Sequence, residues 1–491
     1  MLKDPSPIQH ELEMVTLEQL VPKDHLVRKV DAAIDFEFIR EEVAHLYCKD
    51  NGRPPVDPVR LFKMLILGYL FGIPSERKLV KEIEVNVAYR WFLGMGLTEK
   101  MIDASTFSQN RIRRFNGTNV FERIFNNIVE QAKAKGLIDG YALYTDSTHL
   151  KANANKRKAK NQLKPVKPSA YLNQINEAVE NDRAAHGKKP LKTKQEDVCL
   201  IKNTKVSTTD SDSGFMHRDQ KPQGFFYLDH RTVDGKHNLI IDTHVTAGNI
   251  NDSQPYIERL DSTIATFNLR PAVVGLDAGY FTAPVCHQVE KRHINGIFGY
   301  RRPVRTKNAI KKKHFAYNET TNSYQCPEGQ LLLYKTTTRE GYREYHSNPK
   351  HCINCPRLKE CTTSRHHKKV ITRHVWQASV DRANERRLTD WGKKIYKRRC
   401  ETVERSFADA KQHHNHRYAL FRGKANVQMQ CYLAAAAQNI KKIALINKSV
   451  KNKRYYRFIS GLFAFMRGLF PLKKENSKAY ENIAIAAYGC L

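Results

Sequence analysis

The stretch from residue 141 to 153 constrains the fold of this chain more than any other. Tyr141, Leu143 and Thr145 alternate with residues of a second face that ends at Asp146, and strand-forming residues dominate throughout. The pattern predicts a core β-strand that ends on an acidic residue. A carboxylate in that place is held rigidly where a metal ion or a phosphate can reach it, although a single aspartate more commonly serves in a turn or cap.

The segments after this strand predict a mixed α/β sheet. Strands are expected at 224–233, 239–245, 272–277 and 297–300, with helices over 254–267 and from 283 onward. Asp234-Gly235 predicts a tight turn, so the two strands that flank it pair antiparallel. Three antiparallel strands followed by parallel ones, with helices between them, is the order of a ribonuclease-H-like fold, and we predict an α/β core of that type.

Helical spacing of apolar residues predicts an all-α N-terminal domain over residues 1–136. Within it, the segment 103–115 begins with capping residues and ends with Arg111, Arg113 and Arg114. A recognition helix of a helix-turn-helix unit has this composition. A solvated basic helix packed on its neighbour explains the same residues equally well, so both interpretations stay open.

The charge balance indicates the kind of partner. Lysine and arginine number 83 against 50 aspartates and glutamates, which gives a net charge of +33. Such a surplus favours nucleic acid as the partner over the alternative of a merely basic protein. No signal peptide is visible, and the longest apolar runs, 64–73 and 458–470, are too short to span a bilayer. We therefore expect a cytoplasmic protein with no membrane partner and with reduced cysteines.

Two further carboxylates resemble Asp146 in their context. Asp277 ends the short apolar strand at 272–277, and Glu404 lies beside an apolar stripe in the helical stretch 396–411. Two strand-end aspartates and a helical glutamate can hold two divalent cations about 4 Å apart, and hard oxygen ligands select Mg²⁺ or Mn²⁺. With a polyanion as substrate, the predicted chemistry is phosphodiester cleavage and transfer. An exposed charged helix is the alternative for residues 396–411.

Several segments carry a resemblance to a known family. They are residues 20–25 with 52–55, 144–149, 212–216, 244–252, 275–280 and 401–411. Through them most of the chain, up to about residue 450, resembles the DDE transposases of bacterial insertion sequences, in the branch with a helical N-terminal domain and a cysteine-containing insertion.

The resemblance implies roles for individual residues. Asp146, Asp277 and Glu404 match the catalytic triad of the family, and Lys411, seven residues after Glu404, matches a lysine that contacts the DNA end. It also implies two Mg²⁺ or Mn²⁺ ions per active site. The implied partners are terminal inverted repeats, target DNA and at least one further copy of the chain, in a homodimer or larger assembly on DNA.

The sequence departs from the family pattern at one place. Related transposases often have tyrosine and arginine seven and four residues before the glutamate. Here Tyr396 and Arg399 lie eight and five residues before Glu404, and Cys400 takes the four-before position, so the pair matches only with a shift of one. The residues that we expect on DNA are Lys411, Arg399, Arg405, Arg111, Arg113 and Arg114.

Other polar residues allow competing assignments. Asp210, Asp212, Asp242 and Asp252 would replace Asp277 under a different alignment, which the Leu-Asp-Ala-Gly-Tyr context of Asp277 disfavours. His413, His414 and His416 follow the helix that carries Glu404, and we interpret them as a solvated run rather than as ligands of phosphate or metal.

Four cysteines lie in the interval 301–375, namely Cys326, Cys352, Cys355 and Cys361. In a reducing compartment four thiolates suit a tetrahedral structural Zn²⁺, and a segment with little apolar content needs such support. The alternative is four cysteines without a ligand.

These patterns divide the chain into five parts. They are a helical DNA-binding domain (1–136), the first part of a catalytic core (137–300) with a basic insertion (151–205), a Cys-rich insertion (301–375), the C-terminal helices of the core (376–450) and a basic tail (451–491). We expect the basic insertion to hold one helix, 170–185, and to be mobile without a partner. The predicted function is metal-dependent cleavage of insertion-sequence ends and strand transfer into target DNA. The alternatives are a nuclease that cuts without joining and a non-catalytic DNA-binding relative.

Overall fold

The computed structural model describes residues 13–48, 55–165, 171–191, 201–217, 223–300 and 310–469. The end of the predicted basic tail and parts of both predicted insertions lie outside these residues.

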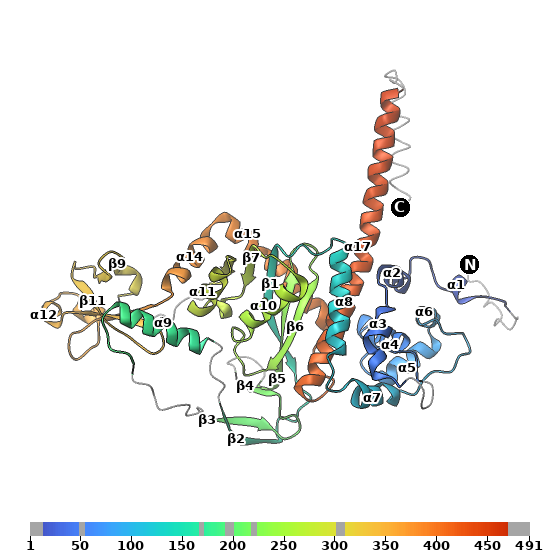
Figure 1. The fold of residues 1–491 in the computed structure, drawn as a ribbon, viewed down its shortest axis with the longest axis horizontal. Coiled ribbons are helices and arrows are strands. Elements are labelled where there is room, and N and C mark those ends of the chain that lie inside the picture. The colour runs from blue at the N-terminus through green and yellow to red at the C-terminus, as the bar shows by residue number, and fades with distance from the viewer. Residues whose placement is uncertain are drawn as a thin grey trace, which may run out of the picture.

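A six-stranded mixed sheet forms the centre of the molecule (Figure 1). Its strands are β1 (Ala142–Lys151), β4 (Gly214–Met216), β5 (Gly224–Asp234), β6 (Ile240–Ala247), β7 (Val273–Leu276) and β8 (Asn295–Phe298). β5 pairs antiparallel with β1 and β6, whereas β7 pairs parallel with β1 and β8. The resulting order β6-β5-β1-β7-β8 confirms the predicted ribonuclease-H-like core.

The first strand differs from the prediction in where it ends. β1 does not stop at Asp146 but continues to Lys151, because the long partner β5 pairs with it as far as Phe226. The parallel pairing with β7 does stop at Thr145, opposite Leu276. Asp146 therefore lies at the edge of the β7 pairing rather than at the end of its own strand.

Helices connect the later strands of the central sheet, and further helices after residue 374 pack on the sheet. They are α10 (Tyr256–Phe267), η3 (Ala278–Tyr280), α11 (Ala283–Lys291), α14 (Gln377–Leu388), α15 (Asp390–Arg399), η5 (Cys400–Glu404) and α16 (Arg405–His413). α15 contacts β7 and β8, and η5 contacts β1 and β5. The helical stretch predicted at 396–411 thus consists of the end of α15, η5 and most of α16, and it packs on the middle strands of the sheet.

The N-terminal region is helical, as predicted. Its elements are α1 (Leu17–Leu20), α2 (Leu26–Ala33), α3 (Phe38–Val43), η1 (Ala44–Leu46), α4 (Pro58–Leu70), α5 (Glu76–Val85), α6 (Val87–Phe92), α7 (Ser105–Asn110), η2 (Arg111–Phe115) and α8 (Val120–Ala134). α5 and α6 are separate because Asn86 adopts an extended conformation, and its side chain caps α6 by accepting from the N–H groups of Ala88 and Tyr89.

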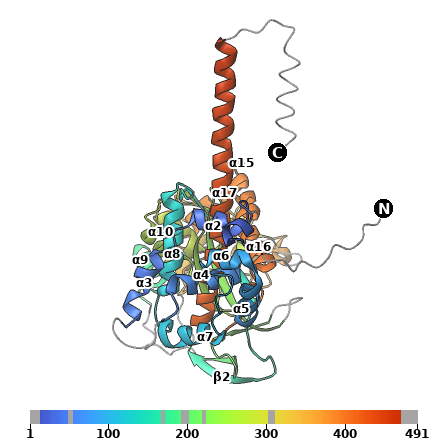
Figure 2. The ribbon, with the colours of Figure 1, turned by 90° about the vertical axis from the view of Figure 1, so that its right-hand side faces the viewer.

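One helix near the end of the chain joins this region to the sheet. α17 (Lys424–Leu469) contacts α2, α4 and α8 on the N-terminal side and β6 on the sheet side. Ala434, Ala435, Ala436 and Ala437 are almost fully buried, and their small side chains allow elements to approach closely on several sides. The far end of α17 extends away from the body of the molecule (Figures 1 and 2).

Both insertions contain strands that the sequence did not reveal. The basic insertion forms an antiparallel ribbon of β2 (Ala159–Pro165) and β3 (Ile201–Ser207), together with α9 (Leu172–Ala185). Residues 310–374, here called the cysteine lobe, form a five-stranded antiparallel sheet in the order β13-β12-β11-β10-β9. These strands are β9 (Ala316–Asn318), β10 (Ser323–Gln325), β11 (Leu331–Thr337), β12 (Tyr342–Ser347) and β13 (Val370–His374), with the short helices η4 (Lys312–His314), α12 (Pro349–Cys352) and α13 (Leu358–Cys361).

Candidate active site

The three predicted carboxylates meet at one edge of the central sheet. Thr145 on β1 is in register with Leu276 on β7, so the next residues, Asp146 and Asp277, are neighbours. Glu404 arrives from the other direction, as the last residue of η5, which packs on β1 and β5. The Asp146 side chain is 19% exposed, while those of Asp277 and Glu404 are 49% and 44% exposed, so the group is open to a ligand from solvent.

A single guanidinium contacts all three carboxylates. Arg399 Nη2 donates to Asp146 Oδ2 at 2.5 Å, while Nη1 lies 3.1 Å from Glu404 Oε1 and 3.8 Å from Asp277 Oδ1. The Arg399 side chain is only 6% exposed. The arrangement places one fixed positive charge among three acidic groups.

The π-helical geometry of η5 accounts for the unusual spacing between Arg399 and Glu404. Residues 400–404 form a π-helix, in which hydrogen bonds join residue i to i+5 instead of i+4. A residue five positions before Glu404 therefore occupies the place that a four-before residue has in an α-helix. Tyr396 shifts with it, and its ring lies 5.8 Å from the Arg399 guanidinium. Sequence reasoning missed this because no residue type marks a π-helix.

Burial raises the pKa of Asp146 to about 6, and the nearby Asp277 adds to this effect, while Arg399 and the Ser147 N–H act against it. The Ser147 N–H donates to Asp146 Oδ1 at 2.8 Å and fixes the plane of the carboxyl group. Additional positive charge close to Asp146 would therefore stabilise the ionised form of its carboxyl group.

Lys411 lies on the same side of β1 as Arg399. Asp146 and Thr148 share one face of the strand because they are two residues apart. Lys411 Nζ donates to Thr148 Oγ1 at 2.6 Å, and the lysine is half-buried. Arg405 follows Glu404 directly and is exposed. The segment 399–411 thus runs along one face of β1, with a cationic side chain at each end.

Three of the competing aspartates are bonded elsewhere. Asp210 accepts from Tyr227 Oη at 2.7 Å and from the Gly423 N–H at 3.1 Å, and Asp212 accepts from the Lys424 N–H at 3.0 Å. Asp242 pairs with Arg259. Asp252 lies after β6, with one buried carboxylate oxygen that has no hydrogen-bond partner.

A buried polar network lies behind the carboxylates and was not predicted. Asp229 on β5 accepts from Arg231 Nε and His416 Nε2, both at 2.8 Å, and from Thr243 Oγ1 at 2.6 Å. His414 and His416 are buried, so the expected solvated run of histidines is wrong for both. Among the described residues, the possible ligand atoms of Asp229, His416 and Cys431 lie within 4.8 Å of one another. Both Asp229 oxygens are already used and Arg231 supplies the positive charge, so we interpret this cluster as a structural ion-pair network.

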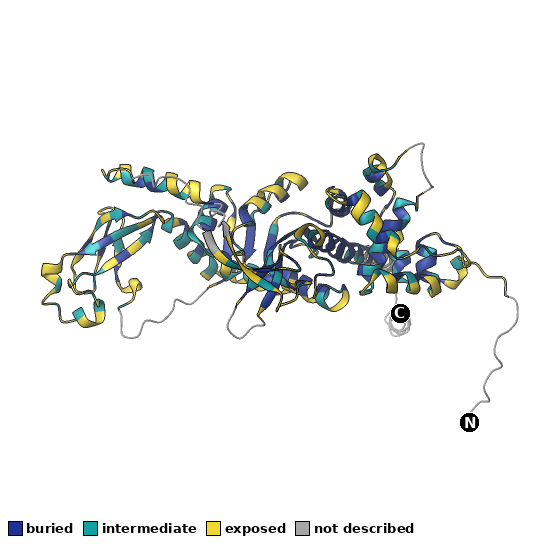
Figure 3. Cartoon of the chain, turned by 90° about the horizontal axis from the view of Figure 1, so that it is seen from below, coloured by how far each residue is buried: buried dark blue, intermediate teal, exposed yellow. Residues whose placement is uncertain are grey.

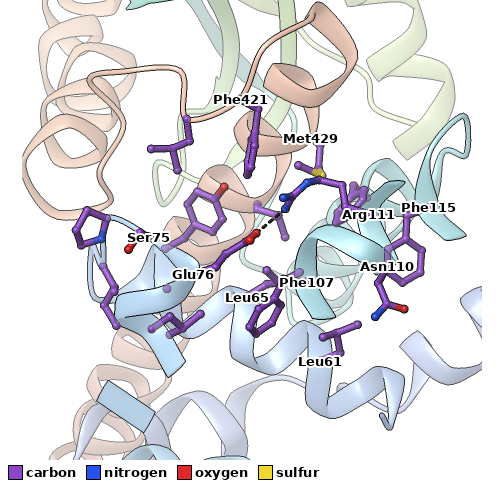
Figure 4. A pocket seen from close by; sticks show the side chains of 18 residues that line it. Leu61, Leu65, Ser75, Glu76, Phe107, Asn110, Arg111, Phe115, Phe421 and Met429 are labelled. Atoms are coloured by element: carbon purple, nitrogen blue, oxygen red, sulfur yellow. Dashed lines mark hydrogen bonds and ion pairs between the residues drawn. The ribbon is translucent and has the colours of Figure 1, made fainter. Parts of the chain in front are cut away.

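The three N-terminal arginines face different surroundings, and Figure 4 shows those of Arg111. Arg111 forms an ion pair with Glu76 at 2.5 Å and stacks 4.2 Å from the Phe421 ring, at the junction with the core. Arg114 lies 4.0 Å from the Tyr47 ring, and Arg113 is exposed. In this arrangement Arg113 is the member of the set that faces solvent.

The four predicted cysteine ligands lie together in the cysteine lobe. Cys326, Cys352, Cys355 and Cys361 line one cavity. No three of their sulfur atoms come within 4.8 Å of one another.

Two family models match the chain. The model described as Transposase domain (DUF772) matches residues 15–113, and the model described as Transposase DDE domain matches residues 325–444. The second match contains Glu404 and begins after Asp146 and Asp277. No curated protein matches the chain.

Solved structures of transposases are also similar to it. The piggyBac transposase synaptic complex with hairpin DNA is 10% identical, with a TM-score of 0.26, over 93% of this chain and 82% of that one. The Mos1 transposase paired-end complex with left transposon end is 11% identical, with a TM-score of 0.15, over 51% of this chain and 61% of that one.

Both family matches are to transposase domains, and they identify the chain as a DDE transposase. More particularly, it belongs to the insertion-sequence DDE transposases and functions as a DNA transposase. Neither match points to a nuclease that cuts without joining, or to a non-catalytic DNA-binding relative. Within the described part of the chain, no helix is long and apolar enough to cross a membrane.

Proposed function

We propose that this transposase cuts and joins DNA at the edge of the sheet where Asp146, Asp277 and Glu404 meet. The observation that carries the proposal is the contact of one guanidinium, that of Arg399, with all three carboxylates. Three acidic side chains from separate parts of the chain lie around one point, where their negative charges repel one another. Such a grouping is typical of a functional site in which a bound cation offsets the repulsion.

The donor set fits Mg²⁺ or Mn²⁺. All three side chains offer hard carboxylate oxygens, and two of them are close to half exposed. We propose that Asp146, Asp277 and Glu404 hold two such ions, which when bound would polarise the phosphodiester and activate the attacking hydroxyl. The role of Arg399 in the absence of metal is to neutralise the carboxylates and keep them in place.

The proposed DNA contacts rest on charge and, for Arg405 and Arg113, also on exposure. We propose that Lys411, Arg399 and Arg405 bind phosphates beside the reacting bond, and that Arg111, Arg113 and Arg114 belong to the surface that meets the terminal repeats, with Arg113 the most available. The ribbon of β2 and β3 and the turn before it carry further exposed cations, at Lys156, Arg157, Lys158, Lys160 and Lys205, which we propose also bind DNA. Affinity from such contacts falls steeply with salt. A homodimer or larger assembly suits a reaction that joins two DNA ends to one target.

The proposed domain division follows from these roles. We propose residues 1–136 as the DNA-binding domain and 137–300 with 376–450 as the catalytic core, with insertions at 151–205 and 301–375 and a basic tail at 451–491. Because α17 packs on both sides of the first boundary, experiments should use the full chain rather than a fragment.

The test uses the full-length protein and DNA that carries the ends of its element. The rates of DNA cleavage and joining are measured in the presence of Mg²⁺, and binding of Mn²⁺ is measured separately by titration calorimetry. Asp146→Asn, Asp277→Asn and Glu404→Gln should each lose cleavage and weaken Mn²⁺ binding, while DNA binding persists. Asp212→Asn is the matched control, because that aspartate is exposed and bonded to the start of α17. Normal cleavage by any of the three variants would remove its residue from the proposed site.

A further inference from the structure

The cysteine lobe has a very small apolar core. Among its described residues, the buried apolar cluster consists of Phe315, Tyr324, Leu332, Tyr345 and Ile371. The central cluster, by contrast, extends from the N-terminal helices through the sheet to α17. Small folds with so few buried apolar side chains usually need a disulfide or a metal to remain folded.

The four cysteines lie on local structures that suit metal binding. Cys326 begins a tight turn between β10 and β11, in which the Gly329 N–H donates to the Cys326 carbonyl at 2.9 Å. In the same turn the Gln330 N–H points at Cys326 Sγ, at 3.3 Å. Cys352 and Cys355 lie on one helical turn, closed by a 3.1 Å hydrogen bond from the Cys355 N–H to the Cys352 carbonyl. Each turn presents sulfur toward the cavity that all four cysteines line.

The basic insertion packs against this lobe. Asp182 of α9 is buried, and it accepts from Arg343 Nε on β12 at 2.8 Å and from Thr337 Oγ1 on β11 at 2.6 Å. His186, just after α9, stacks on Tyr334 at 4.1 Å and bonds Asn322 at 2.8 Å. α9 belongs to the basic insertion, so the two insertions are tied together although they are distant in sequence.

We propose that Cys326, Cys352, Cys355 and Cys361 bind one structural Zn²⁺, and that this ion keeps both insertions folded by holding the lobe on which α9 docks. Each thiol releases its proton on binding, so the four sulfurs act as thiolates around a tetrahedral ion at about 2.3 Å. Zinc binding requires the sulfurs to move closer together than they lie here, where no three are within 4.8 Å of one another. The site is distinct from the carboxylate group, whose oxygen donors prefer harder ions.

The first experiment measures metal in the purified full-length protein. We expect about one zinc per chain in the wild type and in Asp146→Asn, and a loss of nearly all of it in Cys355→Ser. Cys48→Ser is the matched control, because that cysteine is exposed on the N-terminal helical region, outside the lobe. Wild-type protein without zinc but with a protected lobe would overturn the proposal. Zinc that is lost in Asp146→Asn and retained in Cys355→Ser would assign the ion to the carboxylates instead.

The second experiment follows amide hydrogen exchange in wild-type protein before and after treatment with a zinc chelator, so that it does not depend on a variant folding. Exchange should rise in residues 323–374 and also in α9, and remain unchanged in α10, which packs on the sheet. Asp182→Ala should keep its zinc while exchange in α9 alone rises. If α9 stays protected after the lobe has opened, the proposed link between the insertions is wrong.

Discussion

The central sheet and the cysteine lobe both consist largely of antiparallel strands, yet different interactions stabilise them. In the central sheet, β5 is buried along nearly its whole length, and the Asp229–Arg231 pair at its centre is 0% exposed. Figure 3 shows long buried stretches in dark blue in the middle of the molecule, whereas the lobe at its left end mixes them with teal and yellow. The lobe has one small apolar cluster, and the ion pair that joins it to α9, Asp182–Arg343, leaves Arg343 24% exposed. A strand pattern alone therefore does not tell how a region is held together. The amount of apolar surface that the strands bury decides whether a region also needs a stabilising element, such as a bound metal ion, to remain folded.

The largest expected effect separates activity from folding within the central sheet. Glu404→Gln, which removes a charge from the group around Arg399, should reduce DNA cleavage to background, because the site loses one of its three proposed metal ligands. Its urea unfolding midpoint should stay near that of the wild type, since this side chain is 44% exposed. Cleavage assays and urea unfolding on the same preparation check both parts. A large loss of stability would show that Glu404 supports the fold as well.

The next effect tests the two buried ion pairs against each other. Asp229→Ala leaves Arg231 without its partner in a site closed to water, which should cost on the order of 3–5 kcal/mol of unfolding free energy. Asp182→Ala, in α9 at its contact with the lobe, should cost less, because Arg343 is partly exposed and can regain water. Glu37→Ala, at an exposed pair with Arg40, is a control that should change little. Equal losses at Asp229 and Asp182 would contradict the contrast between the two regions.

Acid should weaken both regions through buried histidines, among them His414 in the core and His374 in the lobe. Burial lowers the pKa of His414 in the core and of His374 in the lobe to about 4, from an ordinary value of 6.5. Between these values the folded state binds fewer protons than the unfolded state, so the stabilising contribution is present above pH 6.5 and is lost as the pH falls toward 4. At pH 5 each histidine should cost about 2 kcal/mol. Urea unfolding at pH 7.5 and pH 5 should show a smaller difference for His414→Gln than for the wild type, and an unchanged difference would exclude His414 as the cause.

The smallest effect concerns helix caps. Thr389 Oγ1 accepts from the Gly392 N–H at 3.0 Å at the start of α15, the helix that carries Arg399. Thr389→Ala should lower the unfolding free energy by about 1 kcal/mol. Asn348→Ala removes the cap of α12 in the lobe, and its effect should be visible mainly after zinc is removed. Equal effects of the lobe variant with and without zinc would argue that the metal does not hold α12.

The central fold was predictable because its signals are local. Alternation marks β1 and β5, and an acidic residue directly after a short apolar run marks Asp277. The contacts that the sequence did not reveal are distant ones. His416 reaches Asp229 across 187 positions, and His414 reaches the Tyr69 carbonyl across 345, so no local pattern shows that these histidines are buried.

Two other features were missed for different reasons. The π-helical turn before Glu404 depends on hydrogen-bond geometry that many sequences can adopt, so it was visible only as a spacing that did not fit. The lobe strands are short, three to seven residues, and their pairing depends on turns rather than on a repeated apolar pattern.

The position of α17 has a consequence for how the protein is made. The ribosome synthesises the N-terminal helices and the sheet before α17, yet residues of α17 such as Ile440 and Ile443, which are 0% exposed, complete the packing of α2, α4, α8 and β6. A nascent chain that has not yet reached this helix leaves apolar faces of its earlier parts uncovered. The N-terminal helices and the sheet therefore complete their packing only after α17 has been synthesised, and a chain truncated before residue 424 cannot complete either half.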